Sequence, residues 1–434
     1  MNDSGSESGE KASHVVTAFL RNRGEILLLR RSDAVGTYVG QWGGVSGFAE
    51  GEPDEQVRLE IEEETGLEDA VSLVRSGRPV RFTDADLERT WVVHPYLFDC
   101  ESREVEVREE HDACEWVAPT EILLGGRETV PKLWDAYERV APTVRSIAAD
   151  GDHGAAYLSV RALEVLRDRA GLLTAERDEY GDDPDGEREE LVELARRLLE
   201  ARPAMAVLRN RVNRAMSEAD AEGGAPAVLE AAIGGIERAL EADEVAASEA
   251  SAHATGTVMT LSRSGTVLEA LSRGDPGRVY VAESRPALEG RAVAEELAAT
   301  LEGTVTLHTD AAAAHLLARE DVGCVLVGSD TVLPDGRVVN KTGTRALALA
   351  ARREGVPVYA VAATDKISTR AAVNLEAGSR EAVYDGEASL DVVNPTFDVT
   401  PADAVTGVVT ERGTLSTDEV GEVAEELRAL EEWG

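Results

Sequence analysis

The sequence predicts a three-part chain: a small α+β domain, a helical subdomain, and an α/β domain built on a parallel sheet. Short β-branched runs surround one acidic helical segment in the first 140 residues. Apolar residues then recur at spacings of three and four, and from about residue 256 short strands alternate with helical segments. These patterns place the domains at 13–140, 145–235 and 245–434, after a polar, acidic stretch at 1–12 that is predicted to be a disordered tail.

The first domain is expected to begin with two paired strands. The run HVVTAFLRNRGEILLLRRS has a strand on each side of Arg23 and Gly24, which suit a tight reversal. A helix is predicted over 53–65, because Pro53 suits the first helical position and Gly66 suits the position after the last turn. The runs VRFTD, TWVVHPYLFDC and REVEV predict further strands of this α+β domain.

The two later parts follow from the same kind of pattern. AAYLSVRALEVLRDRAGLL and EREELVELARRLLEARP predict two helices, separated by the acidic linker DEYGDDPDGE. The runs TVMTLS, RVYVAES, TVTLHT, CVLVGSD, VPVYAVA and EAVYD predict strands, with helices at GRAVAEELAATL and TRALALAARREG. Such alternation is typical of a Rossmann-like fold, whose ligands bind at the carboxyl ends of the strands. Asp335 and Gly336 predict a tight hairpin within it.

The charge balance limits what the protein can bind. Its 83 acidic and 44 basic residues give a formal net charge of -39. This charge would repel nucleic acid and argues against phosphate-backbone binding as the main activity. Only four residues are lysines, and an acid-rich, lysine-poor chain is typical of a halophilic protein, because concentrated salt screens self-repulsion.

Cysteine usage and hydropathy indicate a cytoplasmic protein. The three cysteines, Cys100, Cys114 and Cys324, form no CxxC pair, which favours a reducing compartment and argues against structural zinc. No apolar run approaches the length of a membrane span, and the polar start argues against a secretory signal peptide.

The acidic helix carries the first candidate site. Glu60, Glu63 and Glu64 occupy positions i, i+3 and i+4, so their carboxylates project from one helical face. Crowded carboxylates repel one another, and Mg²⁺ or Mn²⁺ would resolve the repulsion and could activate water against a phosphoanhydride. The alternative is a solvated acidic face, of the kind that much of this chain presents.

The order of residues around this helix resembles the Nudix hydrolase family. The resemblance rests on LEIEEETGL preceded by WGGVSGFAEGE, and on the later run EEHDACEWVAPTEI, and it covers residues 13–140. It implies a magnesium-dependent hydrolase in which Glu60, Glu63 and Glu64 are catalytic and hold the metal. The arginine of the family signature falls on Leu59 here, with Arg58 one position early and turned about 100° around the helix.

The second candidate site lies in the run from Gly323 to Ile367. A buried strand is predicted to end at Asp330, whose acid would face the cleft above the sheet. Lys341 and Gly343 stand at the start of a predicted helix, a suitable place for a phosphate. Two of the four lysines, Lys341 and Lys366, fall at predicted strand ends here; the alternative is that they are solvated surface residues.

This region resembles the family that joins the alpha, beta and delta regulatory subunits of translation initiation factor 2B with two isomerases. Those isomerases act on methylthioribose-1-phosphate and ribose-1,5-bisphosphate. The resemblance covers residues 145–434, and it includes AESRPALEGR, which looks like the phosphate segment of the family, and NPTFDVTPADAVTGVVTERG. The catalytic cysteine of the isomerases falls on Ser262, and the sequence shows no obvious base beside it. Isomerase activity is therefore doubtful from the sequence.

Together these features predict a haloarchaeal-type fusion protein that cleaves a nucleoside-diphosphate-linked compound, such as ADP-ribose, and binds a phosphosugar or nucleotide. The predicted ligand-binding residues of the second site are Arg285, Arg291, Ser262, Asn340, Lys341, Gly343 and Lys366, with Asp330 as a catalytic candidate. One alternative is a working ribose-1,5-bisphosphate isomerase, and another is a non-catalytic regulatory subunit in translation. No membrane or nucleic-acid partner is expected, and the resemblance implies a homodimer or larger homo-oligomer.

Overall fold

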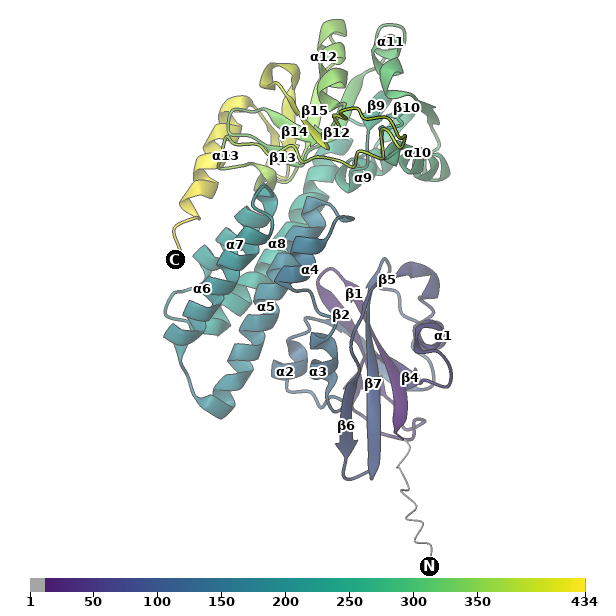
Figure 1. Cartoon of the computed structure of the whole chain (residues 1–434), viewed down its shortest axis with the longest axis vertical. Coiled ribbons are helices and arrows are strands. Elements are labelled where there is room, and N and C mark those ends of the chain that lie inside the picture. Colours follow the sequence, from purple (N-terminus) through teal and green to yellow (C-terminus); the bar gives the residue numbers. More distant parts are fainter. Residues whose placement is uncertain (1–11, 434) are drawn as a thin grey trace, which may run out of the picture. The chain divides into compact units, whose positions relative to one another are not determined.

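The structure is a computed structural model that describes residues 12–433 (Figure 1). Residues 1–11 of the predicted tail lie outside the described part. The chain divides into two compact units. The first comprises the residues up to Ser146 with Glu164–Leu191 and Asp220–Ile233, and the second comprises Ile147–Leu163, Val192–Ala219 and the residues from Gly234 onward. Among the described residues, no helix combines the length and apolar character that a membrane crossing requires.

The first unit contains a mixed sheet in which the parallel pair β1 and β7 lies at the centre. The strands run in the order β3-β2-β1-β7-β5, while β4 also pairs with β1, β6 with β7, and β8 with β2. Their bounds are β1 Ser13–Asn22, β2 Glu25–Arg31, β3 Trp42–Gly43, β4 Val45–Phe48, β5 Val71–Ser76, β6 Val80–Asp84, β7 Arg89–Cys100 and β8 His111–Val117. The helices of this region are α1 Pro53–Thr65, α2 Glu121–Leu124 and α3 Leu133–Glu138.

The predicted hairpin and acidic helix both form. Arg23 and Gly24 have φ angles of 54° and 81°, which turn β1 into β2. Helix α1 has the predicted bounds, and Gly66, at φ 68°, closes it by donating its N–H to the carbonyl of Glu62. Val57 and Ile61 are buried against the sheet in the core between α1 and β4. This packing turns the opposite edge of the helix outward.

The strand predicted at REVEV is wrong. Residues 103–107 belong to no strand, because their backbone groups bond elsewhere. The carbonyl of Arg103 accepts from the indole of Trp116, and the N–H of Glu106 donates to the carbonyl of Thr65. The alternation of apolar and charged residues fits an extended chain, but it does not require a neighbouring strand.

The helical part comprises α4 Val144–Ala149, α5 Ala155–Tyr180, α6 Pro184–Ala201, α7 Ala206–Glu218 and α8 Gly224–Ser251. Helices α5 and α6 extend into the predicted acidic linker from its two sides and leave only residues 181–183 between them. Within the first unit, α5 carries a buried guanidinium toward the β1–β2 hairpin. Arg167 pairs with Asp168 at 2.7 Å and donates to the backbone carbonyl of Gly24. The hydroxyl of Tyr137 donates to Asp168 at 2.9 Å, which joins α3 to the same network.

The second unit is built on a sheet in the order β11-β10-β9-β12-β15-β17-β18, parallel except for β18. The strands are β9 Thr255–Leu261, β10 Asp275–Ala282, β11 Thr304–His308, β12 Cys324–Gly328, β15 Val358–Val361, β17 Gly407–Thr410 and β18 Gly413–Leu415. A small sheet joins β13 Thr331–Val332, β14 Val338–Lys341 and β16 Phe397–Thr400. The helices are α9 Gly265–Arg273, α10 Glu289–Thr300, α11 Ala313–Leu317, α12 Thr344–Glu354 and α13 Thr417–Ala429.

Helices cover both faces of this parallel sheet, as the alternation of strands and helices predicts. Apolar side chains of α9 and α10 pack in one core cluster, and those of α11 and α12 pack in another. Asp335 and Gly336 form the predicted hairpin between β13 and β14. The strand predicted at EAVYD is wrong: residues 381–383 form a turn, and Val383 is 49% exposed, so this run has no buried face. The strand that follows β15 in the sheet is instead β17.

Candidate functional site

Two carboxylates of α1, those of Glu60 and Glu64, face the strand β4. The backbone N–H of Ser46 donates to Oε2 of Glu64 at 3.1 Å, and the Glu64 side chain is buried. A Cβ atom added to Gly47 would lie 2.0 Å from Oε1 of Glu60, so only glycine leaves room for that carboxylate. The Glu60 carboxylate also accepts from Gln56 at 2.8 Å, whereas Glu63 is exposed.

These carboxylates repel one another in a partly desolvated site. Burial raises the pKa of Glu64 well above its usual range, and the charges of Glu60 and Glu110 add to this effect. Burial also raises the pKa of Glu60, and the charges of Glu63 and Glu110 act in the same direction. The second oxygen of Glu64, Oε1, is buried and makes no hydrogen bond within the described residues. A buried anionic oxygen without a partner is costly, and a hard divalent cation would satisfy it.

The donor chemistry therefore fits a divalent cation, although the carboxylates are not gathered around one point. Within residues 12–433, no three His, Cys, Asp or Glu side chains converge closely enough to hold a metal ion as they stand. Glu60 and Glu64 both face β4, and the charge of Glu110 raises the pKa of each. These two side chains are therefore the best placed to bind a metal ion.

Two residues of this site were missed by the sequence reasoning. Arg31 lies at the end of β2, and its positive charge partly offsets the rise in the pKa of Glu64. Its Nε donates to the carbonyl of Thr37 at 2.9 Å. Glu110 precedes β8 and lies within the quoted run EEHDACEWVAPTEI, but nothing in that run marks it as facing α1. Both come from segments remote from α1 in the sequence.

The other polar neighbours do not neutralise Glu64. Nε2 of His111 lies 4.0 Å from Oε2 of Glu64, but burial and the charge of Arg31 lower the pKa of His111 to about 4, so it is neutral near pH 7. Leu59, at the signature arginine position, is 52% exposed. Arg58 lies over the ring of Phe98, 5.7 Å from its centroid, and forms no ion pair with the α1 glutamates in the described residues.

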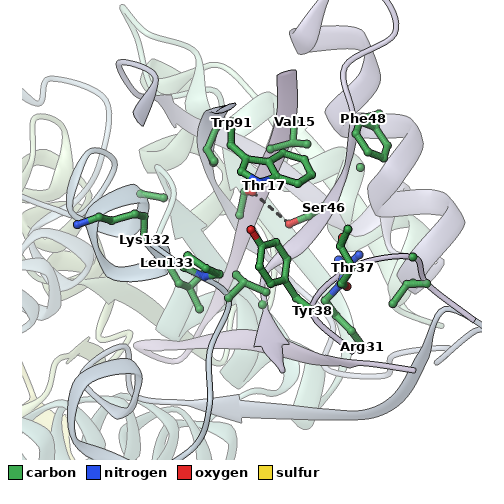
Figure 2. A pocket seen from close by; sticks show the side chains of 18 of the residues that line it. Val15, Thr17, Arg31, Thr37, Tyr38, Ser46, Phe48, Trp91, Lys132 and Leu133 are labelled. Atoms are coloured by element: carbon green, nitrogen blue, oxygen red, sulfur yellow. Dashed lines mark hydrogen bonds between the residues drawn. The ribbon is translucent and has the colours of Figure 1, made fainter. Parts of the chain in front are cut away.

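A pocket of about 520 Å³ opens beside these carboxylates (Figure 2). Its lining includes Ser46 and Gly47, which touch Glu64 and Glu60, so it reaches the acidic face of α1. Figure 2 shows Tyr38, Phe48 and Trp91 around one space. The other aromatic and charged lining residues are Phe82, Arg31, Arg89, Lys132 and Glu110.

The aromatic wall of this pocket is held in place by its neighbours. The rings of Phe48 and Trp91 stack with centroids 6.0 Å apart, and the guanidinium of Arg89 lies 5.0 Å from the Trp91 centroid. The hydroxyl of Tyr38 donates to Asp84 at 2.7 Å. A planar, electron-rich group would find stacking partners here, and Arg31 would meet anionic oxygens at the end near α1.

The second unit gathers its candidate residues at the carboxyl ends of β9 and β12 in the parallel sheet and of β14 in the small antiparallel sheet. Ser262 follows β9, Asp330 follows β12, and Lys341 ends β14. Burial raises the pKa of Asp330, and the charges of Lys366 and Lys341 partly offset this effect. The structure therefore brings together four of the predicted residues, Ser262, Asp330, Lys341 and Lys366.

A carboxylate that the sequence reasoning missed lies among them. Glu289 begins α10, and its Oε2 accepts from the Ser262 hydroxyl at 3.1 Å. Its Oε1 accepts from Nζ of Lys341 at 2.8 Å. Glu289 lies within the run AESRPALEGR, in which Arg285 and Arg291 are the residues predicted to bind a ligand.

The remaining predicted ligands have other partners. Arg291 pairs with Glu283 at 3.6 Å, and the amide of Asn340 donates to Thr344 at 3.0 Å. The side chain of Arg285 is exposed. The roles of these three residues stay predictions.

The start of α12 already holds an internal anion. The backbone N–H of Gly343 donates to Asp398 at 2.8 Å, and that of Arg345 donates to the same carboxylate at 3.1 Å. A phosphate could use these two N–H groups only after displacing Asp398. Lys341 is the predicted cationic ligand that faces the cluster around Ser262, because its partner Glu289 also contacts Ser262.

Comparison with known proteins gives the same two regions. Residues 11–139 match the NUDIX domain, and residues 151–417 match the Initiation factor 2 subunit family. The chain is 34% identical over 313 residues to a ribose 1,5-bisphosphate isomerase of Haloferax volcanii, an alignment that covers 67% of this chain and 94% of that protein. It is 39% identical over 181 residues to a methylthioribose-1-phosphate isomerase of Pseudomonas aeruginosa, covering 38% of this chain and 48% of that protein.

Solved structures agree on the fold of the second region. The translation initiation factor eIF-2B of Pyrococcus horikoshii matches with a TM-score of 0.51 and 26% identity, covering 63% of this chain and 94% of that one. The 5-methylthioribose 1-phosphate isomerase of the same organism matches with a TM-score of 0.52 and 21% identity, covering 73% and 90% of the two chains.

Proposed function

This chain belongs to the initiation factor 2 subunit family and carries a Nudix domain ahead of the family region, and on that premise we propose that it joins a hydrolase to a phosphosugar-binding or nucleotide-binding unit. The Nudix domain would cleave a nucleoside diphosphate linked to another moiety, such as ADP-ribose. The unpartnered, buried oxygen of Glu64, set among repelling carboxylates beside an aromatic pocket, carries this proposal.

The residues of the first unit divide the work of hydrolysis. Glu60 and Glu64, with Glu63 at the rim, would hold Mg²⁺ or Mn²⁺, which supplies Lewis acidity to a phosphoanhydride and acidifies bound water. Arg31, at the end of the pocket near α1, would bind diphosphate oxygens. The stacked rings of Phe48 and Trp91 would position a base.

The test is turnover of ADP-ribose with Mg²⁺ by the full chain in multimolar KCl. We expect the Glu63→Gln, Glu64→Gln double variant to lose at least about a hundredfold in kcat, because a catalytic metal contributes several kcal/mol to the transition state. The matched control is Glu62→Gln, an exposed residue of the same helix that faces neither Ser46 nor Gly47. Equal turnover by the double variant and the wild type would refute the hydrolase.

The second unit supports a second candidate function, sugar-phosphate isomerisation. Its named relatives are isomerases of ribose phosphates, and it places Asp330 and Glu289 at the same sheet edge as Ser262. The contact between Ser262 and Glu289 favours this function over binding alone, because it supplies the base that is not evident from the sequence. Stable binding of a sugar phosphate without any turnover would instead favour the non-catalytic regulatory role.

A further inference from the structure

Glu289 is held by two donors from different elements. The Ser262 hydroxyl, from the loop after β9, donates to Oε2 at 3.1 Å, and Nζ of Lys341, at the end of β14, donates to Oε1 at 2.8 Å. Each oxygen is thus fixed by one hydrogen bond, and each keeps further acceptor capacity. The side chains of Glu289 and Lys341 remain 28% and 23% exposed, so a ligand can reach the carboxylate.

The backbone around Glu289 adopts unusual conformations. Ser262, Ser284 and Leu288 are non-glycine residues with φ angles of 60°, 61° and 63°. The N–H of Ser262 donates to the Ser284 hydroxyl at 2.6 Å, and Leu288 immediately precedes Glu289 at the start of α10. Left-handed conformations of this kind cost energy and cluster at functional sites. Here three of them surround one carboxylate.

Helix α10 begins very close to the end of β10. A Cβ atom added to Gly290 would lie 1.8 Å from the carbonyl oxygen of Ala282, so glycine is required for this approach. The close approach sets Glu289 directly over the carboxyl end of the parallel sheet, where ligands of such sheets bind. Its position therefore follows from two backbone constraints, at Leu288 and at Gly290.

A second carboxyl group with a different environment lies in the same cluster. Asp330 is partly buried, and its desolvation raises its pKa, while Glu289 is partly exposed and bonded to a lysine. The charge of Glu289 adds to the rise in the pKa of Asp330, whereas Lys341 opposes that rise and also donates a hydrogen bond to Glu289. Two carboxyl groups held in unlike environments can serve as an acid and a base toward one substrate.

We propose that Glu289 is a catalytic base of the second unit. Its carboxylate moves a proton between adjacent carbons of a pentose phosphorylated at carbon 1. Ser262 positions the carboxylate, and Asp330 acts as the acid. The proposal rests on the phosphosugar binding proposed for this unit. It assigns the chemistry to a residue that the sequence reasoning did not consider.

The step balances without a further reactant. The Glu289 carboxylate takes the proton from carbon 2 of the ring-closed sugar, the bond between carbon 1 and the ring oxygen breaks, and that oxygen takes the Asp330 proton. An enol with its hydroxyl on carbon 2 results. Glu289 then returns its proton to carbon 1, and the enol hydroxyl gives its proton to Asp330. Both carboxyl groups are restored, and a ketone stands at carbon 2.

The experiment measures conversion of ribose 1,5-bisphosphate by the full chain in multimolar KCl, in D₂O, by NMR. We expect a ketose product with deuterium at carbon 1, because a carboxylic acid proton exchanges with solvent. Glu289→Gln should lower kcat by about 10²- to 10⁴-fold, the usual contribution of a general base, with the dissociation constant of the substrate, measured by calorimetry, changed little. Glu289→Asp, which keeps the carboxylate, should have a kcat between those of the wild type and Glu289→Gln.

Two further variants keep the test decisive. Ser262→Ala removes one hydrogen bond to the base and should lower kcat about tenfold, even if Glu289→Gln folds poorly. Glu296→Gln is the matched control, since Glu296 lies on α10 but pairs with Arg263 at the surface. Wild-type kcat in Glu289→Gln, or binding by the wild type without conversion, would overturn the base assignment alone. Failure of the wild type to bind the sugar would overturn the proposed binding function as well.

Discussion

Gly47 and Glu60 are packed so closely that a methyl group on the glycine would occupy the space of the carboxylate, with a Cβ to Oε1 distance of 2.0 Å. Because the end of a glutamate side chain is flexible, Gly47→Ala should displace Glu60 without unfolding the domain. We expect kcat for ADP-ribose hydrolysis to fall by about tenfold or more, while the melting temperature changes little. Steady-state kinetics and thermal unfolding measure both.

The control for this prediction is Gly51→Ala. A Cβ atom at Gly51 would meet nothing within 4 Å, and its backbone does not require glycine. Gly51→Ala also reduces the conformational entropy of the unfolded chain, as Gly47→Ala does. Equal losses of activity in the two variants would contradict a specific role for the space beside Glu60.

The stability of the first unit should respond to pH and Mg²⁺ together. The folded pKa values of Glu60 and Glu64 are raised above the ordinary value of 4.5, so the folded state binds more protons than the unfolded state. The stability contributed by these groups is therefore greatest at low pH and falls as the pH rises above 4.5. Mg²⁺ binds the charged forms, so its stabilising effect should grow over the same range.

Thermal unfolding with and without Mg²⁺, at about pH 5 and about pH 8, measures this linkage. We expect a larger rise in melting temperature at the higher pH in the wild type. The Glu60→Gln, Glu64→Gln variant should be more stable without metal at the higher pH and should lose the magnesium-dependent rise. An equal rise in both proteins would place the ion elsewhere.

The aromatic wall should set substrate affinity. Phe48 is half exposed and stacks on Trp91, so Phe48→Ala removes a stacking surface while leaving the core intact. Stacking on a base contributes about 1–3 kcal/mol, which corresponds to an increase in KM of roughly 5- to 150-fold. Leu73→Ala on β5, another half-exposed apolar residue that does not line the pocket, should leave KM unchanged. An unaltered KM in Phe48→Ala would exclude base stacking at this wall.

Arg167 should be among the most important residues for the stability of the first unit. Its guanidinium is fully buried and paired with Asp168, and removal of one partner of a buried ion pair typically costs about 3–5 kcal/mol. Arg167→Ala should lower the free energy of unfolding by about this amount in chemical denaturation. Arg169 lies on the same helix as Arg167 and makes a partly exposed pair with Glu190 of α6, so Arg169→Ala should cost at most about 1 kcal/mol.

Local patterns predicted most elements of the fold. The bounds of α1 follow from Pro53 and Gly66, and the parallel sheet follows from its alternation with helices. The strands predicted at REVEV and EAVYD were wrong because strand propensity does not say whether a partner strand or a core is present. In EAVYD, the exposed side chain of Val383 shows that the buried face was missing.

The candidate-site residues could be predicted where they are neighbours in the sequence or where their segment resembles that of a known family. Glu60 and Glu64 lie on one helix, so their spacing revealed them. Glu110 acts on them from a loop that is remote in the sequence. Glu289 reaches Ser262 only because α10 starts against the end of β10, an approach fixed by Gly290 and by the left-handed backbone of Leu288. No local pattern contains that information.

The contact of Arg167 with the β1–β2 hairpin has a consequence for inheritance. The Nudix match ends at residue 139, yet α5, which begins at Ala155, supplies a guanidinium to the carbonyl of Gly24. A recombination event that cut the gene between these points would separate that guanidinium, and the Asp168 partner of Tyr137, from the domain they stabilise. Selection would therefore favour transmission of the Nudix region together with α5, and the fusion would be retained as one heritable unit.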